Sequence, residues 1–432
     1  IAIPMLALAA LAGVLVLFAS EHIFPDRLSH ATAAGLIIAL NPIMVCWAVA
    51  GMESCLFALL MTVSLLLLLG RIDTRRLTAS AIFLALAGMA RPEAAAICPI
   101  AILFVYLQGR SMRRAVQYAA VFTVGFGTYF CLRGLHFGQL FPNTFYAKLD
   151  YGSGLLLLRG LGYVWGFARA MAPALLLCAA AVFLIRTAPT WVKALSTIIA
   201  AQFCIVAYEG GDHFAMYRFM VPVVPLIGLL ALYPCVVFAR RCRPGALMGT
   251  MAIPLGLAAV AVSGLLACKR IKADEPEFVT QYARFQQEAD YARQWKKIGR
   301  WLRAHAPADA SLATVAIGAV GFYSDLRIVD PFGLIDPAIS RSEHDLGAGY
   351  AGHEKFDIDR IFAKRPEYIL LVNYLTLQPV LKESVADDLW GEFNRRLHAD
   401  PRLDQRYRYE SIAIGSRWLN IYRRRNPQAA DA

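Results

Sequence analysis

Long apolar runs separated by short polar segments fill the first 270 residues of the chain. Ten such runs can be placed along the sequence, at residues 1–19, 31–50, 54–70, 77–90, 94–108, 116–133, 171–186, 191–208, 218–239 and 245–267. Each is an apolar stretch of roughly the length that crosses about 30 Å of hydrocarbon as a helix. The pattern therefore predicts about ten transmembrane helices. A single helix over 77–108 would be about 48 Å long, so two short spans that meet at Arg91 fit better.

After about residue 275 the pattern becomes that of an α/β domain. Tyr291, Trp295, Ile298 and Leu302 recur at helical spacing and predict an amphipathic helix over 283–305. Further elements are predicted as strands at 312–317, 327–329, 368–372, 407–414 and 417–423, and as a helix near 382–399. Gly415 and Ser416 separate the last two strands as a hairpin turn. We therefore expect a transmembrane helical domain at 1–270 and an α/β domain at 271–432.

Composition supports a membrane protein and gives its orientation. Hydrophobic residues make up 58% of the chain, charged residues 17%, and the mean hydropathy is +0.50, which excludes an ordinary soluble enzyme of 432 residues. Basic residues gather in four connections: Arg71, Arg75 and Arg76; Arg110, Arg113 and Arg114; Arg186 and Lys193; and Arg240, Arg241 and Arg243. Such connections stay in the cytoplasm during insertion. The predicted spans put all four on that side and the C-terminal domain on the periplasmic or extracellular side.

Four polar clusters then fall together on the outer face, at residues 51–54, 91–93, 142–148 and 209–213. A charge such as Glu53 would cost about 2.5 to 3.5 kcal/mol at mid-membrane, so it is expected at the interface or in a cavity. The alternative interpretation is that Glu53 is simply part of a polar connection between two helices. Arg91 and Glu93 form either an interfacial ion pair or an anion site, because a guanidinium can hold a phosphate with two hydrogen bonds.

The densest of these clusters runs from Glu209 to Arg218. Asp212 is a candidate base or ligand of sugar hydroxyls, and Arg218 a candidate ligand of phosphate. The pair Gly210 and Gly211 either lets the backbone approach a ligand or stops the helix. The aromatic and basic stretch 155–169 predicts a helix lying along the lipid headgroups.

The remaining composition points away from metal and nucleic-acid chemistry. Nine cysteines lie in or beside apolar runs without metal-ligand spacing, and the eight histidines are scattered. The net charge of +12 comes largely from the basic connections. It is better explained by lipid headgroups than by nucleic acid. We therefore expect no metal site and no nucleic-acid partner.

In order along the chain, the Gly51-Met52-Glu53-Ser54 turn, Arg91-Pro92-Glu93, the stretch Phe141 to Lys148 and Gly210-Gly211-Asp212 with Arg218-Phe219 resemble the GT-C glycosyltransferases. The likeness is strongest to the mycobacterial terminal arabinofuranosyltransferase and its bacterial relatives, and it covers nearly the whole chain. It implies an inverting transfer from a polyprenyl-phosphate-linked sugar donor to a cell-envelope glycan acceptor outside the bacterial plasma membrane. Some members of the family use a divalent cation.

The resemblance also implies roles for individual residues. Arg91, Lys148 and Arg218 are expected to bind the donor phosphate, and the substrate-binding candidates are Glu53, Asn143, Tyr146, Asp212 and His213. The family's catalytic base is an aspartate in the first external loop. Since Ile1 already belongs to an apolar run, we expect that loop and at least one further span to precede this sequence, and no residue here is assigned as the base.

Three rival classes share part of this pattern. A transporter or flippase should contain an internal repeat with paired broken helices, which the sequence lacks. An O-antigen polymerase or ligase typically carries a large external loop between spans rather than a C-terminal domain of this size. A catalytically inactive scaffold that binds glycan stays open.

Overall fold

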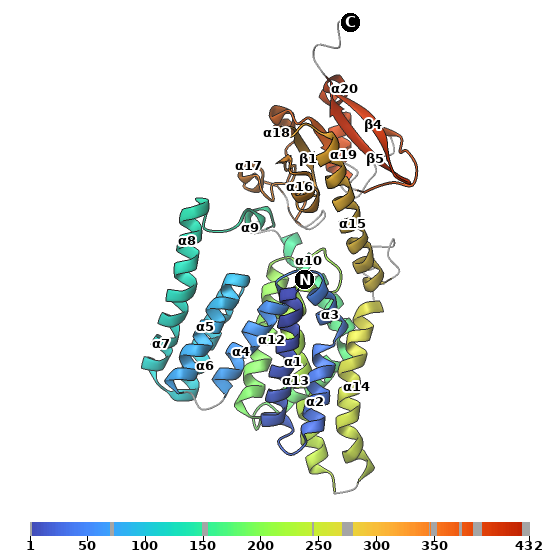
Figure 1. Cartoon of the computed structure of the whole chain (residues 1–432). Helices are drawn as coiled ribbons and strands as arrows, with labels where there is room; N and C mark the ends of the chain where they lie inside the picture. The colour runs from blue at the N-terminus through green and yellow to red at the C-terminus, as the bar shows by residue number, and fades with distance from the viewer. Residues whose placement is uncertain are drawn as a thin grey trace, which may run out of the picture. The chain divides into compact units, whose positions relative to one another are not determined.

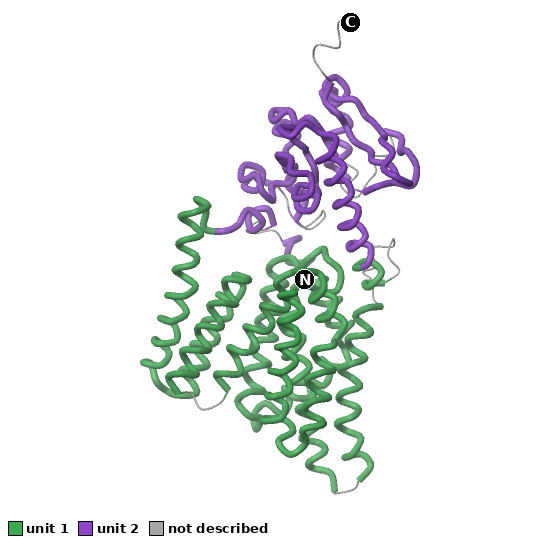
Figure 2. The backbone as a smooth tube through the Cα atoms, viewed as in Figure 1, with its two compact units in different colours: residues 1–140, 157–285 green, residues 141–156, 286–432 purple. Residues whose placement is uncertain are grey.

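The computed structural model describes most of the chain as two compact units. The described residues are 2–69, 73–148, 154–243, 246–269, 280–344, 346, 352–370, 374–382 and 391–425. The first unit comprises residues 1–140 and 157–285, and the second comprises residues 141–156 and 286–432 (Figure 2). The domain boundary expected between residues 270 and 271 lies outside the described residues.

The first unit is a set of helices packed side by side (Figure 1). In chain order its elements are α1 (Ala2–Phe18), the π-helix η1 (Ala19–Ile23), α2 (Leu28–Ala39), α3 (Pro42–Val49), α4 (Ser54–Leu69), α5 (Thr74–Ala90), α6 (Ala94–Gly109), α7 (Met112–Phe122), the π-helix η2 (Thr123–Gly127), α8 (Thr128–Phe137), α10 (Gly154–Ala170), α11 (Ala172–Phe183), α12 (Thr190–Tyr208), the 3₁₀ helix η3 (Arg218–Val223), α13 (Val224–Arg241) and α14 (Leu247–Lys269). Helix therefore lies in each of the ten apolar runs.

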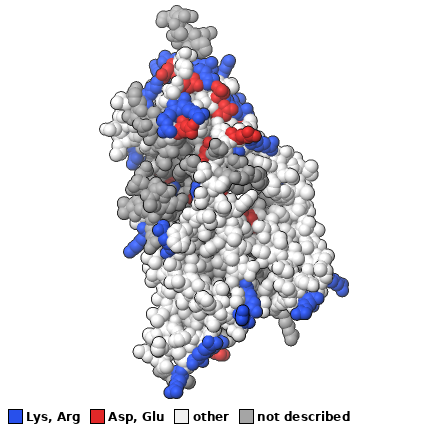
Figure 3. Space-filling model, turned by 180° about the vertical axis from the view of Figure 1, so that it is seen from behind, with Lys and Arg blue, Asp and Glu red and all other residues white. Residues whose placement is uncertain are grey.

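Several of these helices are long and apolar enough to cross a membrane. Among the described residues five helical runs qualify, namely Ala2–Ile23, Met112–Phe137, Thr190–Tyr208, Arg218–Arg241 and Leu247–Lys269. Two bent pairs, α2 with α3 and α10 with α11, bring the number to seven if each pair is one span, and α4 and α6 are shorter apolar helices. Figure 3 shows a broad face of this unit with few charged side chains, and basic side chains gathered at its lower end. These helices indicate that the chain crosses a membrane several times. The predicted number of ten transmembrane helices stays a prediction.

Two predicted spans differ from simple crossings. The run 31–50 is broken between α2 and α3, which are bent by 56°. Pro42 begins α3 and lacks a backbone donor, while the Asn41 side chain accepts a hydrogen bond of 3.0 Å from the N–H of Ile43 and caps the new helix. The run 171–186 forms only the 12-residue α11, about 18 Å long. It meets α10 at 93°.

The turn at Arg91 separates two helices, as predicted. Helix α5 ends at Ala90, α6 begins at Ala94, and the two helices contact each other. Arg91 itself is extended, with φ −147° and ψ 123°. One pass along either helix covers roughly 25 Å, so the basic connections before α5 and after α6 lie a helix length away from this turn.

The second unit contains a mixed five-stranded sheet with helices on both faces. Its elements are α9 (Asn143–Lys148), α15 (Gln281–His305, which begins in the first unit), β1 (Ser311–Thr314), α16 (Ala319–Ser324), β2 (Arg327–Val329), α17 (Pro337–Ser340), α18 (Ile358–Lys364), β3 (Tyr368–Leu370), α19 (Gly391–Ala399), α20 (Pro401–Arg406), β4 (Tyr407–Ile414) and β5 (Arg417–Arg424). The strand order is β2-β1-β3-β5-β4. Strand β1 runs parallel to β2 and β3, and β5 runs antiparallel to β3 and β4.

Buried apolar side chains from the sheet and its neighbouring helices pack on both faces of the sheet. Ile298 and Leu302 of α15 pack with Leu419 and Ile421 on one face, and aromatic residues including Phe393 of α19 pack on the other. The predicted amphipathic helix and the β4–β5 hairpin are confirmed, and a strand lies at each of the other predicted positions. The first of these strands ends at Thr314 instead of residue 317, and the strand predicted at 368–372 is described only as far as Leu370. The helix predicted near 382–399 is confirmed from residue 391, since 383–390 lie outside the described residues.

Candidate functional site

An ion-pair cluster joins two turns of the first unit. Glu53 stands just before α4, Arg91 caps the end of α5, and Glu93 begins α6. Arg91 donates from Nε and Nη2 to Oε1 of Glu93, at 3.1 and 2.5 Å, and from Nη1 to Oε1 of Glu53, at 3.3 Å. Burial alone would raise the pKa of Glu93, but the charge and hydrogen bonds of Arg91 outweigh it and hold that pKa below its usual range.

A second ion pair follows α12. Arg218 Nε lies 2.7 Å from Oδ2 of Asp212, and only 9% and 1% of these side chains are exposed. His213 Nδ1 is 3.6 Å from Oδ1 of the same carboxylate. The backbone carbonyl of His213 accepts a hydrogen bond of 2.5 Å from Arg284. Asp212 therefore stands between an arginine and a histidine in a site nearly closed to solvent.

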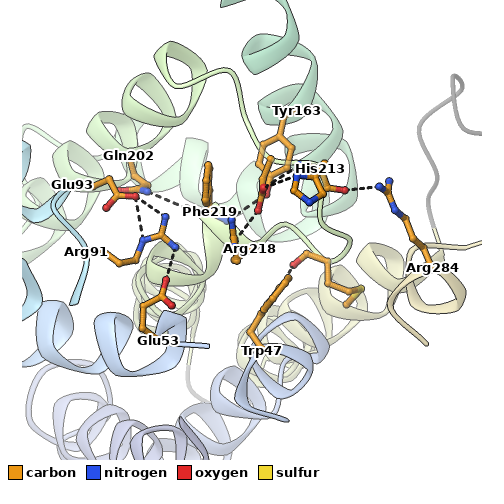
Figure 4. A network of polar contacts seen from close by, with 12 residues as sticks. Trp47, Glu53, Arg91, Glu93, Tyr163, Gln202, His213, Arg218, Phe219 and Arg284 are labelled. Carbon is orange, nitrogen blue, oxygen red and sulfur yellow. Dashed lines mark hydrogen bonds and ion pairs between the residues drawn. The ribbon is translucent and has the colours of Figure 1, made fainter. Parts of the chain in front are cut away.

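Phe219 links the two ion pairs. The guanidinium carbons of Arg91 and Arg218 lie 4.8 and 5.0 Å from the centroid of its ring (Figure 4). A guanidinium over an aromatic ring gains about 0.5 to 2 kcal/mol. Phe219 is itself fixed at both backbone groups, because its N–H donates to the Tyr163 hydroxyl at 3.3 Å and its carbonyl accepts from Gln202 at 3.0 Å. Helices α10 and α12 thus position the ring that both arginines share.

A left-handed turn aims Arg218 into the cluster. Met216 and Tyr217 have φ of +58° and +49°, a conformation that is uncommon for residues other than glycine. Two side chains satisfy the backbone of Met216: its N–H donates to Gln281 at 3.0 Å, and its carbonyl accepts from the indole of Trp47 at 2.8 Å. The surrounding side chains therefore hold a conformation that the local sequence would not favour.

The glycine pair after α12 ends the helix. Gly210 and Gly211 have φ of +79° and +71°, and the N–H of Gly211 bonds to the carbonyl of Val206 five residues earlier, as in a Schellman cap. The close approach at Gly211 is to protein, since a Cβ there would lie 2.6 Å from Cβ of Tyr163. Of the two interpretations offered by the sequence, the helix stop is confirmed.

Carboxylates match the two central arginines of this cluster. Arg91 and Arg218 face the carboxylates of Glu53, Glu93 and Asp212, and Glu209 adds a further favourable interaction with Arg91. Both guanidiniums are thus neutralised by protein groups. A phosphate would have to displace a carboxylate, and Glu53 is the most exposed partner, with 37% of its side chain open.

Five of the eight predicted site residues come together here. Glu53, Arg91, Asp212, His213 and Arg218 all belong to this part of the first unit. Figure 4 labels all of them except Asp212. The other three, Asn143, Tyr146 and Lys148, form α9 in the second unit. Whether they join the same site stays a prediction.

Helix α9 packs within its own unit. It contacts α17, and Arg341 Cζ lies 5.1 Å from the ring centroid of Tyr146. The Lys148 side chain passes close to Gly352, where an added Cβ would lie 2.8 Å from Cε of the lysine. Gly352 has φ of +82°, so a glycine allows both the turn and the close approach.

Most of the groups that hold the cluster carry no functional signal in the sequence. Tyr163, Trp47, Gln202 and Gln281 come from four separate elements and look like ordinary membrane or interface residues along the chain. Phe219 belongs to the Arg218-Phe219 motif, but its role as the shared ring was not predicted. Glu93 was predicted as a possible ion-pair partner of Arg91, and the structure shows this pair. A signal that could have pointed to Phe219 is its position next to Arg218 at the start of a span, where an aromatic ring can stack on a cation.

No three His, Cys, Asp or Glu side chains among the described residues converge as a metal site would require. In the comparisons with known proteins, residues 280–422 match a family described as a domain of unknown function (DUF8728). No curated protein matches the chain.

Proposed function

We propose that the chain is a GT-C-type membrane glycosyltransferase, which moves a sugar from a polyprenyl-phosphate donor to a glycan acceptor outside the plasma membrane with inversion. The observation that carries the proposal is the cluster of Arg91, Arg218 and three carboxylates around Phe219 at the ends of apolar helices. Ionisable groups at such a boundary are costly to keep and are typical of substrate sites.

Orientation follows from the helices that leave the cluster. Helices α5, α6, α12 and α13 each have a cluster residue near one end and a basic connection at the opposite end. Basic connections favour the cytoplasm, so the cluster is assigned to the outer face. The bend of 93° between α10 and α11 suits a helix α10 that lies along the headgroups while α11 enters the membrane.

The chemistry suits a sugar carried on a phosphate. The partly exposed carboxylate of Glu53 can accept hydrogen bonds from sugar hydroxyls. A guanidinium pairs with a phosphate. Arg91 makes its longest contact, 3.3 Å, with the half-exposed Glu53. A donor phosphate could therefore replace this contact at the smallest cost.

The transfer itself breaks the bond between the anomeric carbon and the phosphate oxygen while the acceptor oxygen forms the new bond from the opposite face. Negative charge grows on the departing lipid phosphate, where Arg91 has more to stabilise in the transition state than in the ground state. The acceptor hydroxyl loses its proton to a general base that is assigned to no residue of this chain.

The test is transfer by the full-length protein in liposomes. Synthetic polyprenyl-phosphate sugars serve as donors, an oligosaccharide panel serves as acceptor, and product is measured with and without Mg²⁺. Arg91→Lys keeps the charge but loses the planar fork, so kcat should fall by about 10² or more. Arg303→Gln, an exposed change in the second unit, is the control and should leave transfer unaltered.

The rival classes give different results. Movement of the intact donor across the bilayer without product would identify a transporter or flippase. Binding of acceptor glycan with no turnover of any donor would identify an inactive scaffold. Either outcome would overturn the proposal, as would wild-type kcat in the Arg91→Lys variant.

A further inference from the structure

A large basic hollow lies at one end of the sheet in the second unit. Its volume is about 1000 Å³, at the upper end of the range usual for ligand sites. We call it the arginine hollow, and its charged lining residues are Arg365, Arg406, Arg408, Arg423, Arg424, Arg425, Glu367 and Glu410. Six guanidiniums against two carboxylates leave a strongly positive site.

The strand register forces two of these arginines together. Arg408 of β4 and Arg423 of β5 are direct cross-strand partners in the antiparallel hairpin. Like charges placed opposite each other destabilise a sheet. Glu410 relieves part of this repulsion, since its Oε1 accepts from Arg408 at 3.0 and 2.5 Å, but Arg423 has no ion pair with any described residue.

The second carboxylate is already committed to the fold. Glu367 Oε2 accepts from the N–H and hydroxyl of Ser311 at 2.7 and 2.8 Å, and its Oε1 pairs with Arg424 at 2.6 Å. Within the described part of the chain, Arg365 and Arg406 also make no ion pair. These guanidiniums are exposed to solvent, and a cluster of one sign of charge in a hollow attracts anions.

The shape and lining select among anions. The aromatic rings in the lining, Phe362, Tyr368 and Tyr407, are all buried, so they offer no platform on which nucleic-acid bases could stack. A bilayer surface is flat and matches a hollow poorly. The planar guanidinium of an arginine instead forms two parallel hydrogen bonds with a single phosphate or carboxylate group. Several arginines can therefore bind several such groups that are spaced along one ligand.

We propose that the arginine hollow binds an acidic glycan through its phosphate or carboxylate groups. The identity of this glycan as the acceptor rests on the proposed function, whereas the binding itself does not. The hollow would hold a charged segment of the polymer and raise the local concentration of its reactive end.

Binding can be measured on the full-length chain in nanodiscs of phosphatidylcholine. Fluorescent glycerol-phosphate oligomers and oligogalacturonate test the phosphate and carboxylate sources separately, and a neutral dextran oligomer is the reference. The paired change Arg408→Gln with Arg423→Gln should raise Kd by about tenfold or more, since two charge-assisted hydrogen bonds are lost. The matched control, Arg303→Gln with Arg396→Gln, removes the same charge outside the hollow and should change Kd less than twofold.

A second variant separates charge from folding. Arg408→Lys with Arg423→Lys keeps both charges but loses the planar forks, so its Kd should lie between those of the wild type and of the glutamine pair. An equal loss in the control pair, unchanged binding in the glutamine pair, or binding only to an oligo-dT strand or to phosphatidylglycerol vesicles would overturn the inference. Sugar transfer is assayed on the same samples, so absent turnover with intact binding would count against the proposed function alone.

Discussion

Separating Asp212 from Arg218 should destabilise the first unit far more than breaking an exposed ion pair. The two groups are 2.7 Å apart, with 1% and 9% of their side chains exposed. Breaking a buried pair from one side leaves the other charge unpaired and costs about 3 to 5 kcal/mol. Asp212→Asn and Arg218→Gln should therefore each be severe, and the double variant should cost less than their sum by roughly 2 to 3 kcal/mol.

The measurement is a double-mutant cycle on the free energy of unfolding in mixed micelles. Arg303 and Asp325, 3.7 Å apart and largely exposed, provide the control cycle, whose coupling should stay below about 1 kcal/mol. Additive costs for Asp212→Asn and Arg218→Gln would refute the reasoning. If Arg218 served only as a phosphate ligand, as the sequence suggests, Arg218→Ala would impair transfer more than folding. Burial of the partner carboxylate changes this, and both are now expected to suffer.

Three further predictions concern the turns and the second unit. Trp47→Phe removes the indole donor that holds the left-handed turn before η3, and thermal melts should show a loss of about 1 kcal/mol. Gly211→Ala and Gly51→Ala both place a side chain at positive φ, but only the first also meets a side chain, so it should lower the melting temperature more. Burial would raise the pKa of Glu367, but hydrogen bonds from Ser311 prevail and lower it. The stabilising contribution of Glu367 is therefore present above its unfolded pKa, near 4.5, and is lost as the pH falls through its lower folded pKa. Glu367→Gln should make the free energy of unfolding depend less on pH in this range, as measured by acid unfolding followed with tryptophan fluorescence.

Element type could be predicted from the sequence because it follows from local periodicity. Apolar runs gave the helices, and alternation around Gly415 gave the β4–β5 hairpin. The break at Asn41 and Pro42 carried a signal, a cap residue before a proline, but composition alone made 31–50 look continuous. The position of Asn143 to Lys148 in the second unit could not be predicted, since it depends on contacts with residues nearly 200 positions later.

The Arg91–Glu93 ion pair was one of two interpretations of the sequence. The other pairings within the site lay beyond sequence reasoning for a different reason. The residue types at Glu53, Arg91, Asp212 and Arg218 suggest ligands for phosphate and sugar equally well when each is considered alone. Their burial and mutual neutralisation depend on which turns meet, and that is decided by the packing of α5, α12 and η3 around Phe219.

The two halves of the cluster therefore have different capacities. Arg218 is locked to a carboxylate that solvent hardly reaches, so its main effect is to fix Asp212 and Phe219. Arg91 faces Glu53, whose exposed side chain can move aside without leaving a buried charge. A ligand that exchanges with protein carboxylates should enter where exchange costs least. Among the three arginine and lysine candidates, Arg91 is for this reason the residue on which the proposed transfer depends most directly, and Arg218 acts by positioning.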